Sequence, residues 1–168
     1  MESHSNRSDQ QLFDDICARL AAVAPIMNQM DLSGTVAALQ KLPRPLRAMA
    51  SIHQLDVSLT LDDIVCHFNN WHSRDLALET LSGLVFLGAS REAELFSQAF
   101  AASQPFWKRI GDGNLSSWYY GSELERILEP INDALCKLKD RDAEFGLMRY
   151  WIEYARRDPS WASSEGAA

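Results

Sequence analysis

The sequence lacks the cysteine pattern of a disulfide-stabilised secreted domain or of a zinc site. Its three cysteines, Cys17, Cys66 and Cys136, are far apart, and no CxxC pair is present. An odd number of distant cysteines provides neither an even disulfide framework nor closely spaced zinc ligands. Cys17 and Cys136 fall among apolar positions with helical spacing, so we expect both to behave as small buried hydrophobic residues.

Long apolar segments and catalytic motifs are also missing. No stretch of about 18 apolar residues is present, which argues against a membrane-spanning helix. The first residues lack a basic segment followed by an apolar one, so we expect no signal peptide and a cytoplasmic location. There is no GxSxG, phosphate-binding loop, GxGxxG or HExxH motif. We therefore expect no catalytic residues and no cofactor.

Basic residues are outnumbered by acidic ones, 16 to 23, which gives a formal net charge of −7. Binding to a phosphate backbone requires a basic patch that displaces counterions. Direct nucleic-acid binding is therefore disfavoured, whereas a basic protein partner is compatible with this charge.

Helical periodicity dominates the sequence, and most helical segments begin with a capping residue. Ser8-x-x-Gln11 and Ser122-x-x-Glu125 have the spacing of capping boxes, and Thr60 and Ser73 mark two further expected helix starts. We predict one all-α domain, a compact bundle of about eight helices in residues 9–158, with polar tails at 1–8 and 159–168. Pro130 should kink or split the helix that follows Ser122.

The segment at about 74–88 is apolar on nearly every side. A helix of this kind is normally covered on every side, so we predict that it lies at the centre of the bundle. Gly83 would allow a neighbouring helix to approach closely, and Gly88 would end the segment as a left-handed cap.

Three groups of residues are candidates for partner binding. The acidic residues at helix starts could form a rigid array of negative charge, although compensation of helix dipoles also explains them. The polar segment 69–71 and the aromatics of the irregular stretch 106–121 could anchor a protein interface, although the aromatics could instead cover the core. The predicted partner-binding residues are Asp62, Asp63, Asn69, Asn70, Trp71, Glu92, Glu94, Trp118 and Tyr119.

One group has metal-ligand residue types. Asp63 and His67 are four residues apart, so both could face one ion, with Cys66 or His72 as a third ligand. A helix break is expected between His67 and His72. A solvated helix end is the other reading of the same residues.

Several short elements resemble a known family. Leu42-Pro43 leads into a helix, Phe68 is followed by Asn69-Asn70, and Leu87-Gly88-Ala89 precedes a helix starting at Ser90. In these elements residues 42–100 resemble a bacterial family of small all-helical proteins that takes its name from a DNA-mimic protein. Residues 135–154 resemble the closing helices of that family. The resemblance implies an all-helical fold and macromolecular binding. The chain departs from the family pattern at Thr60–Val65, where the family carries an Asn-Gly-Gly stretch.

These observations favour a non-enzymatic protein-interaction module, in the form of an acidic DNA mimic that inhibits a basic nucleic-acid-binding protein. One alternative is an inhibitor or immunity protein against a toxin or defence enzyme. A second alternative is a metal-dependent enzyme that uses Asp63, His67 and His72. A second copy of this chain is a further candidate partner.

Overall fold

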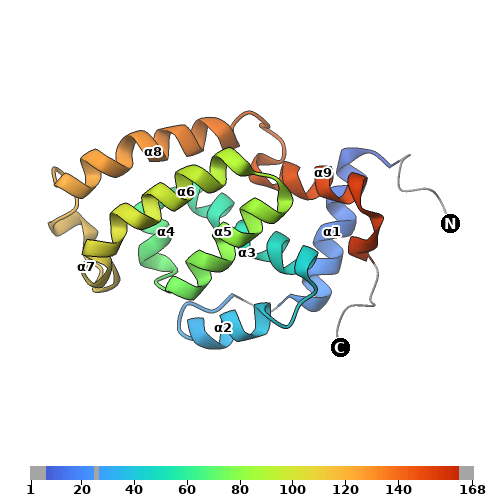
Figure 1. Cartoon of the computed structure of the whole chain (residues 1–168), viewed down its shortest axis with the longest axis horizontal. Helices are drawn as coiled ribbons and strands as arrows, with labels where there is room; N and C mark the ends of the chain where they lie inside the picture. Colours follow the sequence, from blue (N-terminus) through green and yellow to red (C-terminus); the bar gives the residue numbers. More distant parts are fainter. Residues whose placement is uncertain (1–6, 25–26, 163–168) are drawn as a thin grey trace.

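A computed structural model describes residues 7–24 and 27–162, and every regular element within them is a helix (Figure 1). The predicted all-α fold is confirmed. The α-helices are α1 (Asp9–Val23), α2 (Leu32–Leu39), α3 (Arg44–Leu61), α4 (Ile64–Asn70), α5 (Arg74–Leu87), α6 (Ser90–Ser103), α7 (Trp107–Gly111), α8 (Glu123–Lys139) and α9 (Arg149–Arg157). None of the described helices combines the length and the apolar character needed to cross a membrane. The tail residues 1–6 and 163–168 lie outside the described part of the chain.

Helix α3 passes through the middle of the bundle and packs against α4, α5 and α8 (Figure 1). Its closest partner is α5, and Gly83 of α5 lies at their contact. A Cβ atom at this glycine would lie 2.5 Å from Ser51 Oγ and 3.0 Å from the Ala48 carbonyl oxygen. The first distance is shorter than real Cβ contacts, and the second is tighter than most of them. The prediction that Gly83 permits close helix packing is therefore confirmed.

The expectation that the helix at 74–88 is covered on every side is wrong. Leu78 and Val85 of α5 are 52% and 61% exposed, although the opposite face of α5 is buried against α3. The buried face carries Leu76, Leu84 and Leu87 together with the smaller Ala77, Thr80 and Gly83, whereas Leu78 and Val85 lie on the outer face. The apolar composition led to the expectation of complete coverage, but composition alone does not determine whether a further helix covers the outer face.

Most predicted helix ends are confirmed by their hydrogen bonds. Ser8 accepts from the Gln11 N–H, and the Gln11 side chain accepts from the Ser8 N–H, which completes the capping box. The Ser73 and Ser122 side chains each accept from the backbone N–H three residues further on. Gly88 has φ 90° and ends α5 in the left-handed conformation.

Three boundaries differ from the predictions. Thr60 lies inside α3, because the buried Leu59 keeps this turn helical, and its hydroxyl donates to the Asp56 carbonyl oxygen at 2.8 Å. Helix α8 continues through the exposed Pro130, so the helix is not split there. The predicted C-terminal tail begins with a further 3-10 helix, Pro159–Ala162, in which Trp161 is only 3% exposed.

Candidate functional site

The reversal between α3 and α4 brings two adjacent carboxylates to one corner of the bundle. Helix α3 ends at Leu61, and Asp62 follows as its C-cap residue. Asp63 caps α4, because its carboxylate accepts from the Cys66 N–H at 2.8 Å. Asp and Asn are preferred caps because a short polar side chain satisfies an N–H group that the helix itself leaves unpaired. The cap fixes the orientation of the Asp63 carboxylate.

Helix α8 and the turn before it complete this corner. The Ile64 N–H donates to the side-chain oxygen of Asn132 at 3.0 Å, which ties α4 to α8. The carboxylate of Glu125 accepts a short hydrogen bond from the Gly121 N–H, which holds the turn after Tyr120. We name the surface formed by Leu61, Asp62, Asp63, Tyr120 and Glu125 the acidic corner.

The acidic corner combines exposed apolar groups with negative charge. Leu61 is 80% exposed and Tyr120 is 63% exposed. Among the described residues, the carboxylates of Asp62, Asp63 and Glu125 form no ion pair with a basic side chain. Exposed apolar side chains close to unpaired charges are typical of protein-interaction surfaces.

The negative field of this corner acts on the neighbouring ionisable groups. Burial, the charge of Asp63 and hydrogen bonds to Asp62 and Asp63 raise the pKa of the Cys66 thiol. Charge on Cys66, slight desolvation and the nearby carboxylates raise the pKa of Tyr120. Both shifts mean that additional negative charge is disfavoured here, whereas a positive group from a partner is attracted.

The three thiols are not activated for chemistry. Burial raises the pKa of Cys17 and of Cys136, as it does for Cys66. A nucleophilic cysteine requires the thiolate, which these environments disfavour at neutral pH.

The predicted metal set Asp63, His67 and His72 is not assembled. In the described part of the chain, the one group of three or more such ligands comprises Asp62, Asp63 and Cys66, with their ligand atoms within 4.8 Å of one another. His67 is buried and its Nδ1 lies 3.0 Å from Ser58 Oγ. The His72 ring instead stacks on Trp107 with ring centroids 4.6 Å apart. The helix break expected between the two histidines separates their environments.

The segment 69–71 contributes mainly to internal packing. The Asn69 side chain donates to the Ile110 carbonyl oxygen at 2.6 Å, and it thereby holds α7 against α4. Trp71 is half-buried and packs against the core, whereas Asn70 is exposed. Of these three predicted partner-binding residues, Asn70 has the most accessible side chain.

The predicted aromatic residues lie beside the acidic corner but face inward. Tyr119 is 4% exposed. Trp118 is half-buried, with the Arg109 guanidinium 4.5 Å from its ring centroid. Aromatic character alone did not distinguish these residues from the exposed Tyr120.

The two predicted acidic residues of α6 are not part of this surface. Glu92 is 1% exposed, and its carboxylate accepts from Arg149 at 2.8 Å and from the Tyr150 hydroxyl at 2.7 Å. Its expected place on an exposed face is therefore wrong, because α9 and the segment before it cover this turn of α6. Glu94 is exposed, but it pairs with Arg91.

Leu61 was missed as a functional candidate. At the end of an amphipathic helix, a leucine is normally interpreted as a core residue, and no local signal marks this one as exposed. The other two residues were partly indicated by the sequence, because Tyr120 belongs to the aromatic segment and Glu125 to a capping box.

Comparison with known proteins gives no assignment. No protein-family model matches the chain, and neither a curated protein nor a solved structure is significantly similar to it. The resemblance of residues 42–100 and 135–154 to the DNA-mimic-type family therefore stays a prediction.

Buried His67 makes stability depend on pH. Burial lowers the pKa of His67 from 6.5 to about 4. Between these values the unfolded chain binds a proton that the folded chain excludes, so stability is fully present above pH 6.5 and falls as pH is lowered towards 4. We expect a loss of about 3 kcal/mol from this residue, since one pKa unit corresponds to about 1.4 kcal/mol. Urea denaturation at several pH values measures it.

The matched variant is His67→Leu, which removes the titrating group and retains an apolar side chain at this buried position. Asp56 acts in the opposite sense, because burial raises the pKa of its carboxyl and folding then favours its protonated form in acid. The difference between wild type and variant in the pH dependence of the unfolding free energy therefore gives the contribution of His67 alone. Equal pH dependence of the two proteins would show that His67 is not buried in its neutral form.

Proposed function

We propose that this protein is a non-enzymatic interaction module that binds a basic protein through the acidic corner. The observation that carries the proposal is the exposed Leu61 and Tyr120 beside three carboxylates without ion-pair partners among the described residues. An apolar centre supplies buried area on binding, and unpaired charges around it select a partner of opposite sign.

Binding is favoured over catalysis by the state of the reactive groups. The raised pKa values of the three thiols keep them protonated, and His67 is buried and neutral. A general base or nucleophile must instead reach its substrate in the reactive protonation state. These features support a role in recognition.

The fixed geometry of the carboxylates supports mimicry of nucleic acid as the form of this interaction. Asp63 and Glu125 are both held by backbone N–H groups, so their charges keep their positions when a partner approaches. A DNA-binding protein presents the complementary basic surface. In its specific form, the proposal is that this chain is a bacterial relative of the DNA-mimic-type family. It would inhibit such a DNA-binding protein in the cytoplasm.

The test uses neutral variants that preserve the hydrogen bonds. Asp62→Asn, Asp63→Asn and Glu125→Gln combined in one protein remove three charges but retain the acceptors, and Asn remains a good helix cap. The matched control removes three exposed charges elsewhere through Asp14→Asn, Glu144→Gln and Glu153→Gln. Each protein is immobilised, and proteins retained from a lysate of the source organism are eluted with rising salt.

We expect wild type and control to retain the same partner, and the corner variant to bind it about tenfold more weakly at low salt. Raising salt from about 0.05 to 0.5 M should release the partner from wild type, since screening weakens attraction between surface charges. Duplex DNA should compete for the released partner. Equal retention by wild type and corner variant, or no partner at all, would contradict the proposal.

A further inference from the structure

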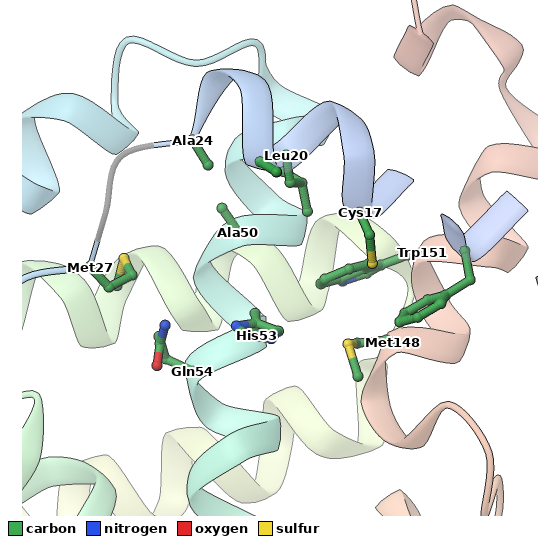
Figure 2. A pocket seen from close by; sticks show the side chains of 11 residues that line it. Cys17, Leu20, Ala24, Met27, Ala50, His53, Gln54, Met148 and Trp151 are labelled. Atoms are coloured by element: carbon green, nitrogen blue, oxygen red, sulfur yellow. The ribbon is translucent and has the colours of Figure 1, made fainter. Parts of the chain in front are cut away.

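A pocket of about 550 Å³ lies between α1, α3 and the segment that contains Met148 and Trp151 (Figure 2). Its volume is within the range of roughly 300–1,000 Å³ that is typical of small-molecule sites. The pocket is lined in part by residues of α1 and α9, and Figure 1 shows these helices at the end of the molecule away from the start of α8. It is thus separate from the acidic corner.

One side of the pocket is aromatic and sulfur-rich. The Trp151 indole is almost fully buried and stacks with Phe13, with ring centroids 6.1 Å apart and planes inclined by 20°. Cys17 and Met148 lie on the same side of the pocket as Trp151 (Figure 2). Aromatic rings and polarizable sulfur atoms make favourable contacts with a planar aromatic group.

The other side carries two polar side chains. Figure 2 shows His53 near the middle of the lining residues, with Gln54 on the side away from Trp151. Within the described part of the chain, neither the His53 ring nitrogens nor the Gln54 side-chain amide forms a hydrogen bond. Both groups are therefore free to bind a polar atom of a ligand.

The described lining residues carry no charge. None of the eleven lining residues is Asp, Glu, Lys or Arg. An ionised ligand would lose its hydration here without a compensating ion pair, which is unfavourable. A neutral ligand avoids this cost.

We propose that this pocket binds a neutral aromatic small molecule that carries one hydrogen-bonding group, such as a carbonyl. The ring system lies against the half-buried Phe13 and Met148, and the polar group accepts a hydrogen bond from the side-chain amide of Gln54. This arrangement places apolar surface on apolar surface and satisfies the polar side chains with few hydrogen bonds, as in other small-molecule sites.

A neutral naphthalene dye with a ketone group, 6-propionyl-2-dimethylaminonaphthalene, provides a direct probe. Its emission depends on the polarity of its surroundings, so fluorescence titration of the full chain reports binding. We expect saturable binding of one dye per chain. The sulfonated dye anilinonaphthalene sulfonate, an aromatic anion, should bind at least about tenfold more weakly because of its charge.

Two alanines of α1 provide a matched pair of variants. Ala21 lines the pocket and is exposed, whereas the adjacent exposed Ala22 does not line it. Ala21→Phe should fill the pocket and weaken dye binding by about tenfold or more, whereas Ala22→Phe should change it less than about twofold. Because both positions are exposed, neither variant requires repacking of the core.

Gln54→Met tests the polar side of the pocket. It should weaken binding of the ketone dye by roughly two- to tenfold, the value of one hydrogen bond, and should not weaken binding of 2-dimethylaminonaphthalene, which lacks the ketone. Absence of saturable dye binding, or equal weakening by Ala21→Phe and Ala22→Phe, would overturn the proposed site. Equal effects of Gln54→Met on both dyes would overturn the polar contact.

Discussion

Replacing Arg149 by methionine is expected to lower the free energy of unfolding by about 3–5 kcal/mol, because the buried Glu92 carboxylate would lose its counterion. The side chains of Arg149 and Glu92 are 13% and 1% exposed and lie 2.8 Å apart. Arg149 also donates to the carbonyl oxygens of Leu138 at 2.8 Å and of Gly146 at 3.2 Å. One guanidinium thus joins α6, the end of α8 and the start of α9.

Urea denaturation at pH 7 measures this loss, and a double-mutant cycle with Glu92→Gln separates its causes. In the double variant the buried charge is absent, so part of the stability lost in Arg149→Met should return. A loss below about 1 kcal/mol in Arg149→Met, a value typical of exposed pairs, would mean that water reaches Glu92 and that the ion pair is not buried.

Replacing Phe68 by alanine should also lower the free energy of unfolding by about 3–5 kcal/mol, through loss of apolar contacts and formation of a cavity. Phe68 is 1% exposed. Its ring centroid lies 5.5 Å from that of Phe96, 5.9 Å from Phe100 and 5.7 Å from Trp107. The aromatic ring therefore connects α4, α6 and α7.

The matched control is Phe106→Ala. Phe106 is half-buried and stacks on Trp118 at 6.4 Å between ring centroids. Its loss should cost clearly less stability, since part of its surface is already in contact with water. Equal losses for the two variants in urea denaturation would show that Phe68 is not the centre of this cluster.

The local part of the fold could be predicted from the sequence. Capping residues act within one helical turn, so Ser8, Ser73, Ser122 and Gly88 indicated helix ends that the structure confirms. Thr60 failed as a helix start because Asp63 offers the same chemistry three residues later. The choice between them depends on the burial of Leu59, which is a tertiary property.

Contacts between distant residues could not be predicted in this way. Glu92 in the first turn of a helix has the pattern of an exposed residue that compensates the helix dipole, and nothing nearby indicates its bond to Arg149. The exposure of Leu61 and the pocket beside His53 likewise depend on which helices cover which faces. Hydrophobic periodicity gives the inward face of each helix, but it does not identify the neighbour that covers it.

The pairing of α1 with α9 has a practical consequence. Arg156 of α9 bonds to Asp9 of α1, so the first and last α-helices lie together at one end of the bundle, remote from the start of α4 (Figure 1). A resin, dye or fusion domain attached before α1 or after α9 is therefore held at the same end of the bundle. Attachment from either direction leaves the surface around Tyr120 facing the solvent, where an incoming protein can reach it.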